Sequence, residues 1–353
     1  MSYRLTVEPL GRTVDIREGQ TILDACLREG IWLPHACGHG LCSSCKVTVT
    51  DGDVDLGSIS PFALMDFERE EGMALACSAT AQSDITIEAD IDIDEDAKCY
   101  PVRDFQGRVA RIEDLTPDIK GVWIALDGDG ITFQPGQYIN LDIPGLETPR
   151  AYSLANPASQ RNLVELHIRL VPDGKASTYV HTQLTEGSPI SFSGPYGQFF
   201  VRKSQSGPTL FLAGGSGLSS PKSMILDLLE EGWSDPITLI HGVRTAKDVF
   251  FRDLFEKLAA DHPKFRYVPA LSQPEAGDGW TGETGFVHEV AERLFDGKFN
   301  GLKAYLCGPP VMIEACVDTL MKGRLFEKSI FAERFLSAAD ANTKSKSPLF
   351  RKV

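Results

Sequence analysis

The sequence lacks any run of eighteen apolar residues, the length that a membrane-spanning helix requires. It also lacks a basic excess, because 49 Asp and Glu outnumber 35 Lys and Arg and leave a net charge of −14. Nucleic-acid binding is therefore not expected, since phosphates need clustered Lys and Arg. The amino terminus shows no signal-like apolar segment, so we expect a cytoplasmic protein without a membrane partner.

The negative charge is concentrated in residues 1–100, which hold 19 Asp and Glu against 7 Lys and Arg. Five of the seven residues in 90–96 are acidic, and such a run cannot pack as a core. We therefore expect a linker there and a first domain that ends near residue 98. An acidic surface suits partner docking and solubility alike, and the sequence leaves both open.

A chain of 353 residues is long enough for two or three domains. The first hundred residues show strand-like alternation about Gly11 and a short helix that Thr21 caps. The elements expected in this domain are a hairpin of residues 3–8 and 12–17, a helix over 22–29, and strands over 46–50 and 85–88.

The remaining pattern changes once. From 102 to about 201, short strands broken by Gly and Pro indicate an antiparallel barrel, and from 209 onward strands alternate with helices, which predicts a parallel α/β sheet. The predicted domains are residues 1–98, 99–203 and 204–337, followed by a basic tail over 338–353 that we expect to be disordered. The fold class is therefore multidomain, with α+β, all-β and α/β parts.

Four of the eight cysteines follow a spacing that is typical of plant-type [2Fe–2S] clusters. Three of them share one loop, and the fourth follows after 31 residues. Gly38 and Gly40 would let backbone amides approach the cluster sulfurs. The predicted ligands are Cys37, Cys42, Cys45 and Cys77.

The loop partly matches two other kinds of metal site, a structural zinc site and a Rieske centre. A structural zinc site favours paired Cys-x2-Cys knuckles, and this loop has one such pair with an x4 neighbour. A Rieske centre begins like Cys37-Gly38-His39, but no Cys-x2-His partner follows. We therefore interpret His35 and His39 as loop residues, and Cys26 as a core residue of its helix.

Three short motifs lie in the predicted barrel. Arg150-Ala151-Tyr152-Ser153 ends one strand, His167-Ile168-Arg169 lies on the next, and Gly174-Lys175-Ala176-Ser177 opens a short helix. Free amides at a helix start attract phosphate groups. Each motif alone is weak, and Tyr152 by itself would fit a half-buried strand position.

A glycine loop, Gly214-Gly215-Ser216-Gly217, follows an apolar strand and precedes a helix that we expect to begin near Pro221. Such a loop lets a pyrophosphate approach a helix start, although a plain tight turn is also possible. Cys307-Gly308-Pro309-Pro310 ends the last clear strand of the sheet. Taken alone, Cys307 would fit a buried structural cysteine at that strand end. Arg244, with Lys247, could hold a 2′-phosphate or be solvated.

In the order of these motifs the chain resembles the ferredoxin–NADP reductase superfamily, which implies an amino-terminal β-grasp ferredoxin domain, a flavin-binding barrel and a nucleotide-binding α/β domain. The resemblance implies that Tyr152 lies on the flavin ring, that Ser153 bonds its N5 and that Cys307 borders the nicotinamide. It makes Ser153, Cys307 and Glu333 the candidate catalytic residues. The implied cofactor-binding residues are Arg150, Tyr152, Ser153, His167, Arg169, Gly174, Lys175, Ala176, Ser177, Gly214, Gly215, Gly217, Arg244, Cys307, Gly308 and Phe335.

The order of the modules narrows the resemblance to the reductase components of bacterial multicomponent oxygenases. The segments 60–66, 214–221 and 320–335 resemble the reductases of phenol hydroxylases, the diiron aromatic monooxygenases. The resemblance implies FAD, a preference for NADH, and electron delivery through the cluster to a hydroxylase component. A reductase of a Rieske dioxygenase or of a toluene or alkene monooxygenase remains the near alternative, and a redox-sensing iron–sulfur protein the distant one.

Overall fold

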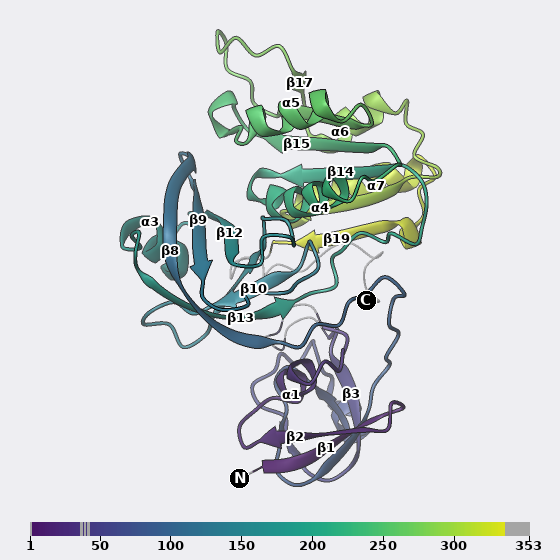
Figure 1. The fold of residues 1–353 in the computed structure, drawn as a ribbon. Helices are drawn as coiled ribbons and strands as arrows, with labels where there is room; N and C mark the ends of the chain where they lie inside the picture. The colour runs from purple at the N-terminus through teal and green to yellow at the C-terminus, as the bar shows by residue number, and fades with distance from the viewer. Residues whose placement is uncertain (1, 36–37, 39, 41–42, 336–353) are drawn as a thin grey trace. The chain divides into compact units, whose positions relative to one another are not determined.

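The computed structural model describes residues 2–35, 38, 40 and 43–335 (Figure 1). The described residues divide into two compact units, one up to Arg103 and one from Asp104 onward. Among the described residues, no helix is both long enough and apolar enough to cross a membrane.

The first unit is built on a mixed five-stranded sheet in the order β2-β1-β7-β3-β5. Its strands are β1 (Ser2–Glu8), β2 (Arg12–Arg17), β3 (Lys46–Asp51), β5 (Met73–Leu75) and β7 (Ile85–Glu88), beside a small pair, β4 (Val54–Asp55) and β6 (Thr80–Ala81). The helices are α1 (Ile22–Arg28) and α2 (Asp66–Glu70). The predicted hairpin, helix and later strands are thereby confirmed, whereas α2 was not predicted.

Helix α1 follows from its sequence. The Thr21 hydroxyl accepts the amide hydrogen of Asp24 at 3.2 Å, which satisfies one of the free donors at the helix start. Apolar side chains along α1 are buried, and Cys26 is fully buried among them. Burial raises the pKa of the Cys26 thiol to about 12, so this residue is confirmed as core.

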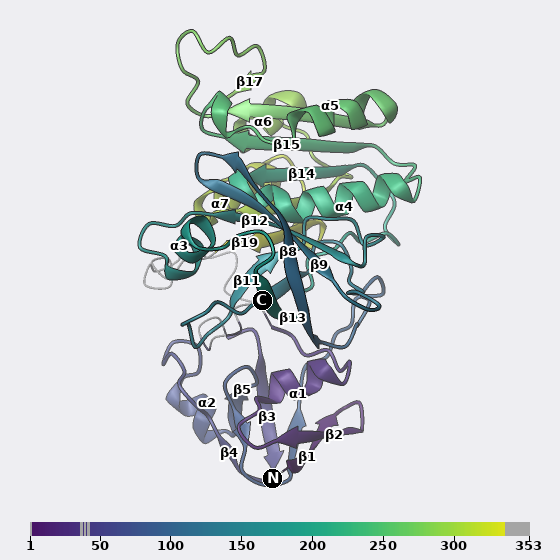
Figure 2. The ribbon, with the colours of Figure 1, turned by 60° about the vertical axis from the view of Figure 1, so that its left-hand side comes forward.

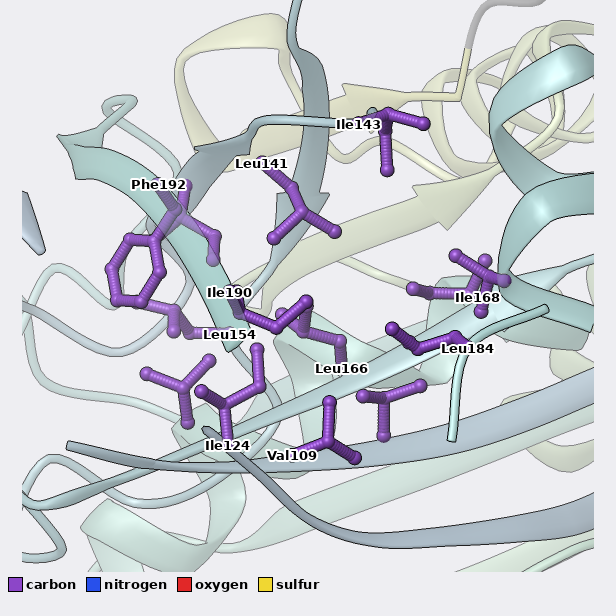
Figure 3. Packing of buried hydrophobic residues seen from close by; sticks show 14 of the residues in the cluster. Val109, Ile124, Leu141, Ile143, Leu154, Leu166, Ile168, Leu184, Ile190 and Phe192 are labelled. Atoms are coloured by element: carbon purple, nitrogen blue, oxygen red, sulfur yellow. The ribbon is translucent and has the colours of Figure 1, made fainter. Parts of the chain in front are cut away.

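The second unit begins with a six-stranded antiparallel sheet in the order β11-β10-β13-β8-β9-β12. Its elements are β8 (Arg103–Thr116), β9 (Ile119–Leu126), β10 (Tyr138–Leu141), β11 (Arg150–Ser153), β12 (Leu163–Arg169), β13 (Pro189–Tyr196) and α3 (Lys175–Thr182). The sheet curls into a near-closed barrel, because side chains from five of its strands and from α3 share one apolar core (Figure 3). Figure 3 shows Val109, Ile124, Leu166 and Phe192 in this core.

The rest of the second unit is a parallel sheet in the order β17-β16-β15-β14-β18-β19. Its strands are β14 (Thr209–Gly214), β15 (Ile237–Val243), β16 (Phe265–Leu271), β17 (Glu283–Thr284), β18 (Lys303–Gly308) and β19 (Ile330–Arg334). The helices are α4 (Ser219–Glu230), α5 (Arg252–Asp261), α6 (Val287–Leu294) and α7 (Pro310–Lys322), with 3-10 turns η1 (Gly215–Leu218), η2 (Ala246–Asp248) and η3 (Glu327–Ser329). Helix α3 packs on the barrel, whereas α4 and α7 run along the parallel sheet (Figure 2).

The strand order has a functional consequence. From β14 the chain moves outward through β15 to β17 and then returns to the other side of β14 with β18. The order therefore reverses between β14 and β18, and open α/β sheets bind ligands beyond the carboxyl ends of the strands at such a point. In this chain those carboxyl ends carry Gly214 and Gly308.

Three details differ from the sequence prediction. The glycine loop is itself a 3-10 turn, and α4 begins at Ser219 rather than near Pro221. Pro221 fits in this first turn because amides there have no acceptor within the helix, so the hydrogen that proline lacks is not needed. The structure also adds β19 beyond the strand that ends at Gly308, and this strand carries Glu333.

Candidate active site at the junction of barrel and nucleotide sheet

Three side chains, those of Ser153, Ser220 and Cys307, meet around the carboxyl of Glu333. Cys307 and Glu333 are register partners on β18 and β19, so they lie on the same face of the sheet. The Glu333 Oε2 atom accepts hydrogen bonds from Ser220 Oγ at 2.7 Å and from Ser153 Oγ at 3.2 Å, and Cys307 Sγ lies at 3.6 Å. The three residues that were predicted as catalytic are thus brought together, and α4 adds Ser220.

The protonation of this cluster is shifted by its surroundings. Burial raises the pKa of Glu333, and the bonds from Ser220, Ser153 and Cys307 act against that effect because they stabilise the carboxylate. The residue as a whole is half-buried, whereas its three donors are buried. Burial, and next the neighbouring carboxyl, raise the pKa of the Cys307 thiol well above its usual range. Cys307 is therefore a neutral thiol at neutral pH.

The glycine loop lies directly against the turn that follows β18. A Cβ on Gly217 would lie 2.3 Å from the Cys307 carbonyl oxygen, and a Cβ on Gly214 would lie 2.5 Å from Met312 Sδ. Gly215 has φ +55°, a conformation that glycine adopts without strain. Only residues without a Cβ therefore allow these two loops to meet at the point where the strand order reverses.

Arg169 reaches the glycine loop from the barrel. Its Nε donates to Asp118 Oδ2 at 2.8 Å, and its Nη1 lies 3.1 Å from the position that a Cβ on Gly215 would take. The guanidinium is thus held at one side while it lies against the loop. A fixed cation beside backbone amides suits the oxygens of a pyrophosphate.

His167 is placed in a buried polar network between β12 and α4. Its Nε2 bonds Glu165 Oε1 at 2.9 Å, and its Nδ1 lies 3.1 Å from Ser219 Oγ. The other carboxylate oxygen of Glu165 accepts from Lys222 Nζ at 2.7 Å. Burial lowers the pKa of His167, so the ring is neutral. Because the carboxylate can only accept, Nε2 carries the hydrogen, and Nδ1 faces the Ser219 hydroxyl, which donates to the Ser216 carbonyl at 2.9 Å.

The flavin motifs lie on β11 and α3. Tyr152 is half-buried on β11, and burial raises the pKa of its hydroxyl to about 12. Arg150 is exposed, and its Nη1 donates to the carbonyls of Thr148 and Pro149 at 2.8 and 3.1 Å. The Ser177 hydroxyl accepts from the Val171 amide and donates to the Gly174 carbonyl, so it shapes the turn.

The start of α3 fits a phosphate group. No described side chain caps this helix at Gly174, which leaves the first-turn amides of Lys175 and Ala176 available. A Cβ on Gly174 would lie 2.7 Å from Ser177 Oγ, so glycine is needed for this tight turn. These residues fit the diphosphate of a flavin dinucleotide.

The cluster loop is described only in part, because Cys37, His39 and Cys42 lie outside the described residues. Cys45 is buried, and Cys77 Sγ accepts a hydrogen bond from the Gly40 amide at 3.3 Å. A Cβ on Gly40 would lie 2.9 Å from Ser78 Oγ. Amides that donate to cysteine sulfur stabilise a reduced iron–sulfur cluster, so the residues that are described fit this group.

The other predicted residues have the following contacts, each within its own unit. The Phe335 amide donates to the Gly308 carbonyl at 3.0 Å, which continues the pairing of β19 with β18. Arg244 is exposed just beyond β15, and the nearby Lys247 Nζ lies 3.9 Å from Glu275 Oε1. His35 Nδ1 bonds the Leu33 carbonyl at 2.8 Å, as expected for a loop histidine.

Sequence reasoning missed Ser220, Lys222 and Glu165. Ser220 lies in the segment 214–221 that carries the family resemblance, but no role was assigned to it, and Lys222 and Glu165 belong to no motif. A usable signal was the run of polar residues directly after the glycine loop, at the start of a helix that follows a buried strand. Buried polar groups require partners, and the partners of this run lie on the barrel and on β19.

Three family models match the chain. They are the 2Fe-2S iron-sulfur cluster binding domain over residues 5–82, the oxidoreductase FAD-binding domain over 106–201 and the oxidoreductase NAD-binding domain over 211–318. Fold, site and matched domains define an NADH-dependent iron–sulfur flavoprotein reductase that carries FAD and a [2Fe–2S] cluster.

Relatives define the family more closely. Over 100% of both sequences the chain is 55% identical to the phenol 2-monooxygenase reductase component DmpP of Pseudomonas sp. strain CF600. It is 56% identical, again over 100% of both, to the phenol hydroxylase P5 protein of Acinetobacter pittii. The crystal structure of the Amycolatopsis reductase GcoB has a TM-score of 0.86 at 33% identity and covers 94% of this chain and 98% of that one. The chain belongs to the family of reductase components that supply multicomponent phenol monooxygenases, within the ferredoxin–NADP reductase superfamily.

Proposed function

We propose that this protein delivers electrons from NADH to the diiron hydroxylase component of a phenol or related aromatic monooxygenase. The observation that carries the proposal is the 55% identity to a phenol 2-monooxygenase reductase over the whole length of both chains. The convergence of Ser153 and Cys307 on one carboxyl oxygen of Glu333 supports the hydride-transfer site. When bound, FAD accepts two electrons together and the [2Fe–2S] cluster passes them on singly.

On the flavin side, we assign binding roles to the barrel residues. The amides of Lys175 and Ala176 and the guanidinium of Arg150 would hold the diphosphate, while Tyr152 offers a flat ring to the flavin. The Ser153 hydroxyl has a single hydrogen, which it donates in a hydrogen bond to Glu333 in this structure. Rotation of that hydroxyl would direct the hydrogen at the flavin ring as negative charge develops there.

On the nicotinamide side, the glycine loop and Arg169 would hold the dinucleotide pyrophosphate. Cys307 and Gly308 would form the wall beside the nicotinamide, with Phe335 at the rim. Because the Cys307 thiol is neutral, this wall adds no charge next to a hydride donor. The Glu333 carboxyl would lie beside this wall, and burial raises its pKa. We assign Arg244 to the adenosine end of the dinucleotide.

We assign the cluster to the thiolates of Cys37, Cys42, Cys45 and Cys77. The proposal includes domains of residues 1–98, 99–203 and 204–337, in the same order as the three family matches. It also includes a cytoplasmic location, because thiolate ligands persist in a reducing compartment.

The test is reconstitution with purified oxygenase components. We expect NADH consumption that matches product formation when the partner is a phenol hydroxylase, with its regulatory components present. Oxygenase components of a Rieske dioxygenase and of a toluene monooxygenase serve as matched alternatives. Tight coupling to either of these, together with none to phenol hydroxylase, would overturn the proposed partner while leaving the electron-transfer chemistry in place.

A further inference from the structure

Ser220 makes the shortest contact to the carboxyl of Glu333. It lies in the first turn of α4 and is fully buried. Its Oγ is 2.7 Å from Glu333 Oε2, compared with 3.2 Å for Ser153 Oγ and 3.6 Å for Cys307 Sγ. The hydroxyl of a serine that bonds a carboxylate must be the donor. Ser220 therefore gives its one hydrogen to Glu333.

The three donors differ in what else they must do. In the proposed function, Ser153 and Cys307 face the two cofactors, and each has only one hydrogen to give. While Ser153 donates toward the flavin, it cannot also donate to Glu333. Ser220 comes from α4, and its neighbours at this site are the Glu333 carboxyl and the Cys307 thiol. It is the donor that can stay on the carboxyl when Ser153 turns away.

We propose that Ser220 is a positioning residue that holds the Glu333 carboxyl in place and sets its proton affinity while Ser153 acts at the flavin. This inference rests on the proposed function of the same site. It gives a reason for the polar side chain in a fully buried helix start, where an apolar residue would otherwise pack.

Within the described part of the chain, three side chains face the carboxyl. The thiol of Cys307 faces it from β18, and β11 and α4 supply the hydroxyls of Ser153 and Ser220. Arg334 is the next residue on β19, and successive side chains of a strand point to opposite faces. The hydrogen bonds from these three donors thus oppose the effect of burial on the carboxyl, which raises its pKa.

The test compares Ser220→Ala with Ser223→Ala in the full-length holoenzyme. Ser223 is also fully buried in α4, but its hydroxyl donates to the Asn156 carbonyl at 2.6 Å. The protonated Glu333 carboxyl is followed by its infrared carbonyl band, identified by subtraction of the Glu333→Gln spectrum. We expect Ser220→Ala to raise the titration midpoint of this band by about one pH unit, because one stabilising bond to the carboxylate is lost. Ser223→Ala should leave the midpoint unchanged.

Flavin reduction by NADH supplies the second readout, in stopped flow as a function of pH. The pH dependence of its rate constant should shift upward with the infrared midpoint in Ser220→Ala, and Ser220→Thr, which restores the hydroxyl, should return both toward wild type. An unchanged midpoint in Ser220→Ala, or an equal shift in Ser223→Ala, would overturn the assignment. If NADH fails to reduce even the wild-type flavin, the proposed function itself is wrong, which is a distinguishable result.

Discussion

At the scale of single residues, the site is organised by the hydrogen bonds that side chains donate to the Glu333 carboxyl. Glu333 is an acceptor surrounded by three donors, and burial raises the pKa of its carboxyl. Ser153 is the donor that comes from the barrel, whereas Ser220 and Cys307 come from the nucleotide sheet and its first helix. A change at Ser153 should therefore affect the step that links the two cofactors and leave the sheet intact.

We expect Ser153→Ala to slow reduction of the flavin by NADH by an amount that corresponds to about 1 to 3 kcal/mol. The reason is the loss of a hydrogen bond that strengthens as charge develops on the flavin ring. Stopped-flow absorbance measures the rate directly. Ser159→Ala, at an exposed serine that bonds Glu230, is the control. A wild-type rate in Ser153→Ala would contradict the role given to this hydroxyl.

His241 provides a second prediction at this scale. Its Nε2 lies 3.2 Å from the Gly215 carbonyl, and burial lowers the pKa of its ring to about 4. Between pH 6.5 and about 4 the unfolded chain binds a proton at this residue that the folded chain does not. Stability should therefore fall as the pH is lowered through this window, by up to about 3 kcal/mol from His241.

The measurement is calorimetric unfolding of the full chain across this pH range. In His241→Asn, which keeps a donor for the loop carbonyl, the loss of stability on acidification should be smaller by roughly that amount. His262→Gln, at the end of α5, is the control for a histidine outside the site. Equal slopes in wild type and His241→Asn would show that this ring is not the group that titrates.

At the scale of elements, α4 joins the nucleotide sheet to the barrel. Lys222 is buried, and its ammonium donates to Glu165 Oε2 at 2.7 Å and to the Ala155 carbonyl at 3.1 Å. Burial acts to raise the pKa of the Glu165 carboxyl, but the hydrogen bond from His167 and the charge of Lys222 together outweigh it and lower the pKa to about 2. A buried ion pair of this kind adds little net stability over an apolar pair, but removal of one partner leaves an uncompensated buried charge.

Removal of one partner should be costly. We expect Lys222→Met to lower the free energy of unfolding by about 3 to 5 kcal/mol, because Glu165 is left buried without its counter-charge. The double change Lys222→Met with Glu165→Gln should recover much of that loss. Lys203→Met is the control, since its ammonium pairs with Asp227 and Glu231 in a more exposed position and should cost about 1 kcal/mol or less. Thermal denaturation of the four proteins decides the matter, and an equal loss in the single and double variants would contradict the account.

The same elements show what the sequence could and could not predict. Thr21 and Gly174 mark helix starts through local chemistry, so α1 and α3 were predicted from residues alone. Helix α2 has only five residues and buries none of them, which leaves no periodic signal. Strand β19 becomes a strand by pairing with β18, a contact that lies far along the chain. Ser220 gains its meaning in the same way, from a partner 113 residues away.

At the scale of the whole molecule, the acidic excess of residues 1–100 bears on how electrons pass from the cluster to the partner protein. Beside the cluster loop lies a surface that we call the α2 patch, formed by exposed apolar and acidic side chains. The Ser60 amide donates to the Gly40 carbonyl at 3.1 Å, and Ser43 Oγ donates to the Ala63 carbonyl at 2.8 Å, so this segment is tied to the loop. The α2 patch consists of Phe62, Met65, Asp66, Phe67, Glu70 and Glu71.

We expect the α2 patch to dock on the hydroxylase, with its carboxylates speeding encounter and Phe62, which is 81% exposed, anchoring the contact.

Glu68 is left unchanged in the test, because it bonds Lys46 and the Met65 amide that begins α2. The test variant neutralises Asp66, Glu70 and Glu71 as amides, and the control makes the same charge change on the sheet of this unit at Glu8, Asp15 and Glu88. At low salt, electron delivery to the hydroxylase should slow several-fold in the test variant alone, and the difference should shrink as the Debye length falls from about 30 Å at 0.01 M to about 10 Å at 0.1 M. Reduction of ferricyanide by NADH should be equal in both variants, since the dye accepts electrons without docking. Equal slowing of hydroxylase turnover in the two variants would mean that net charge, and not this surface, governs the encounter.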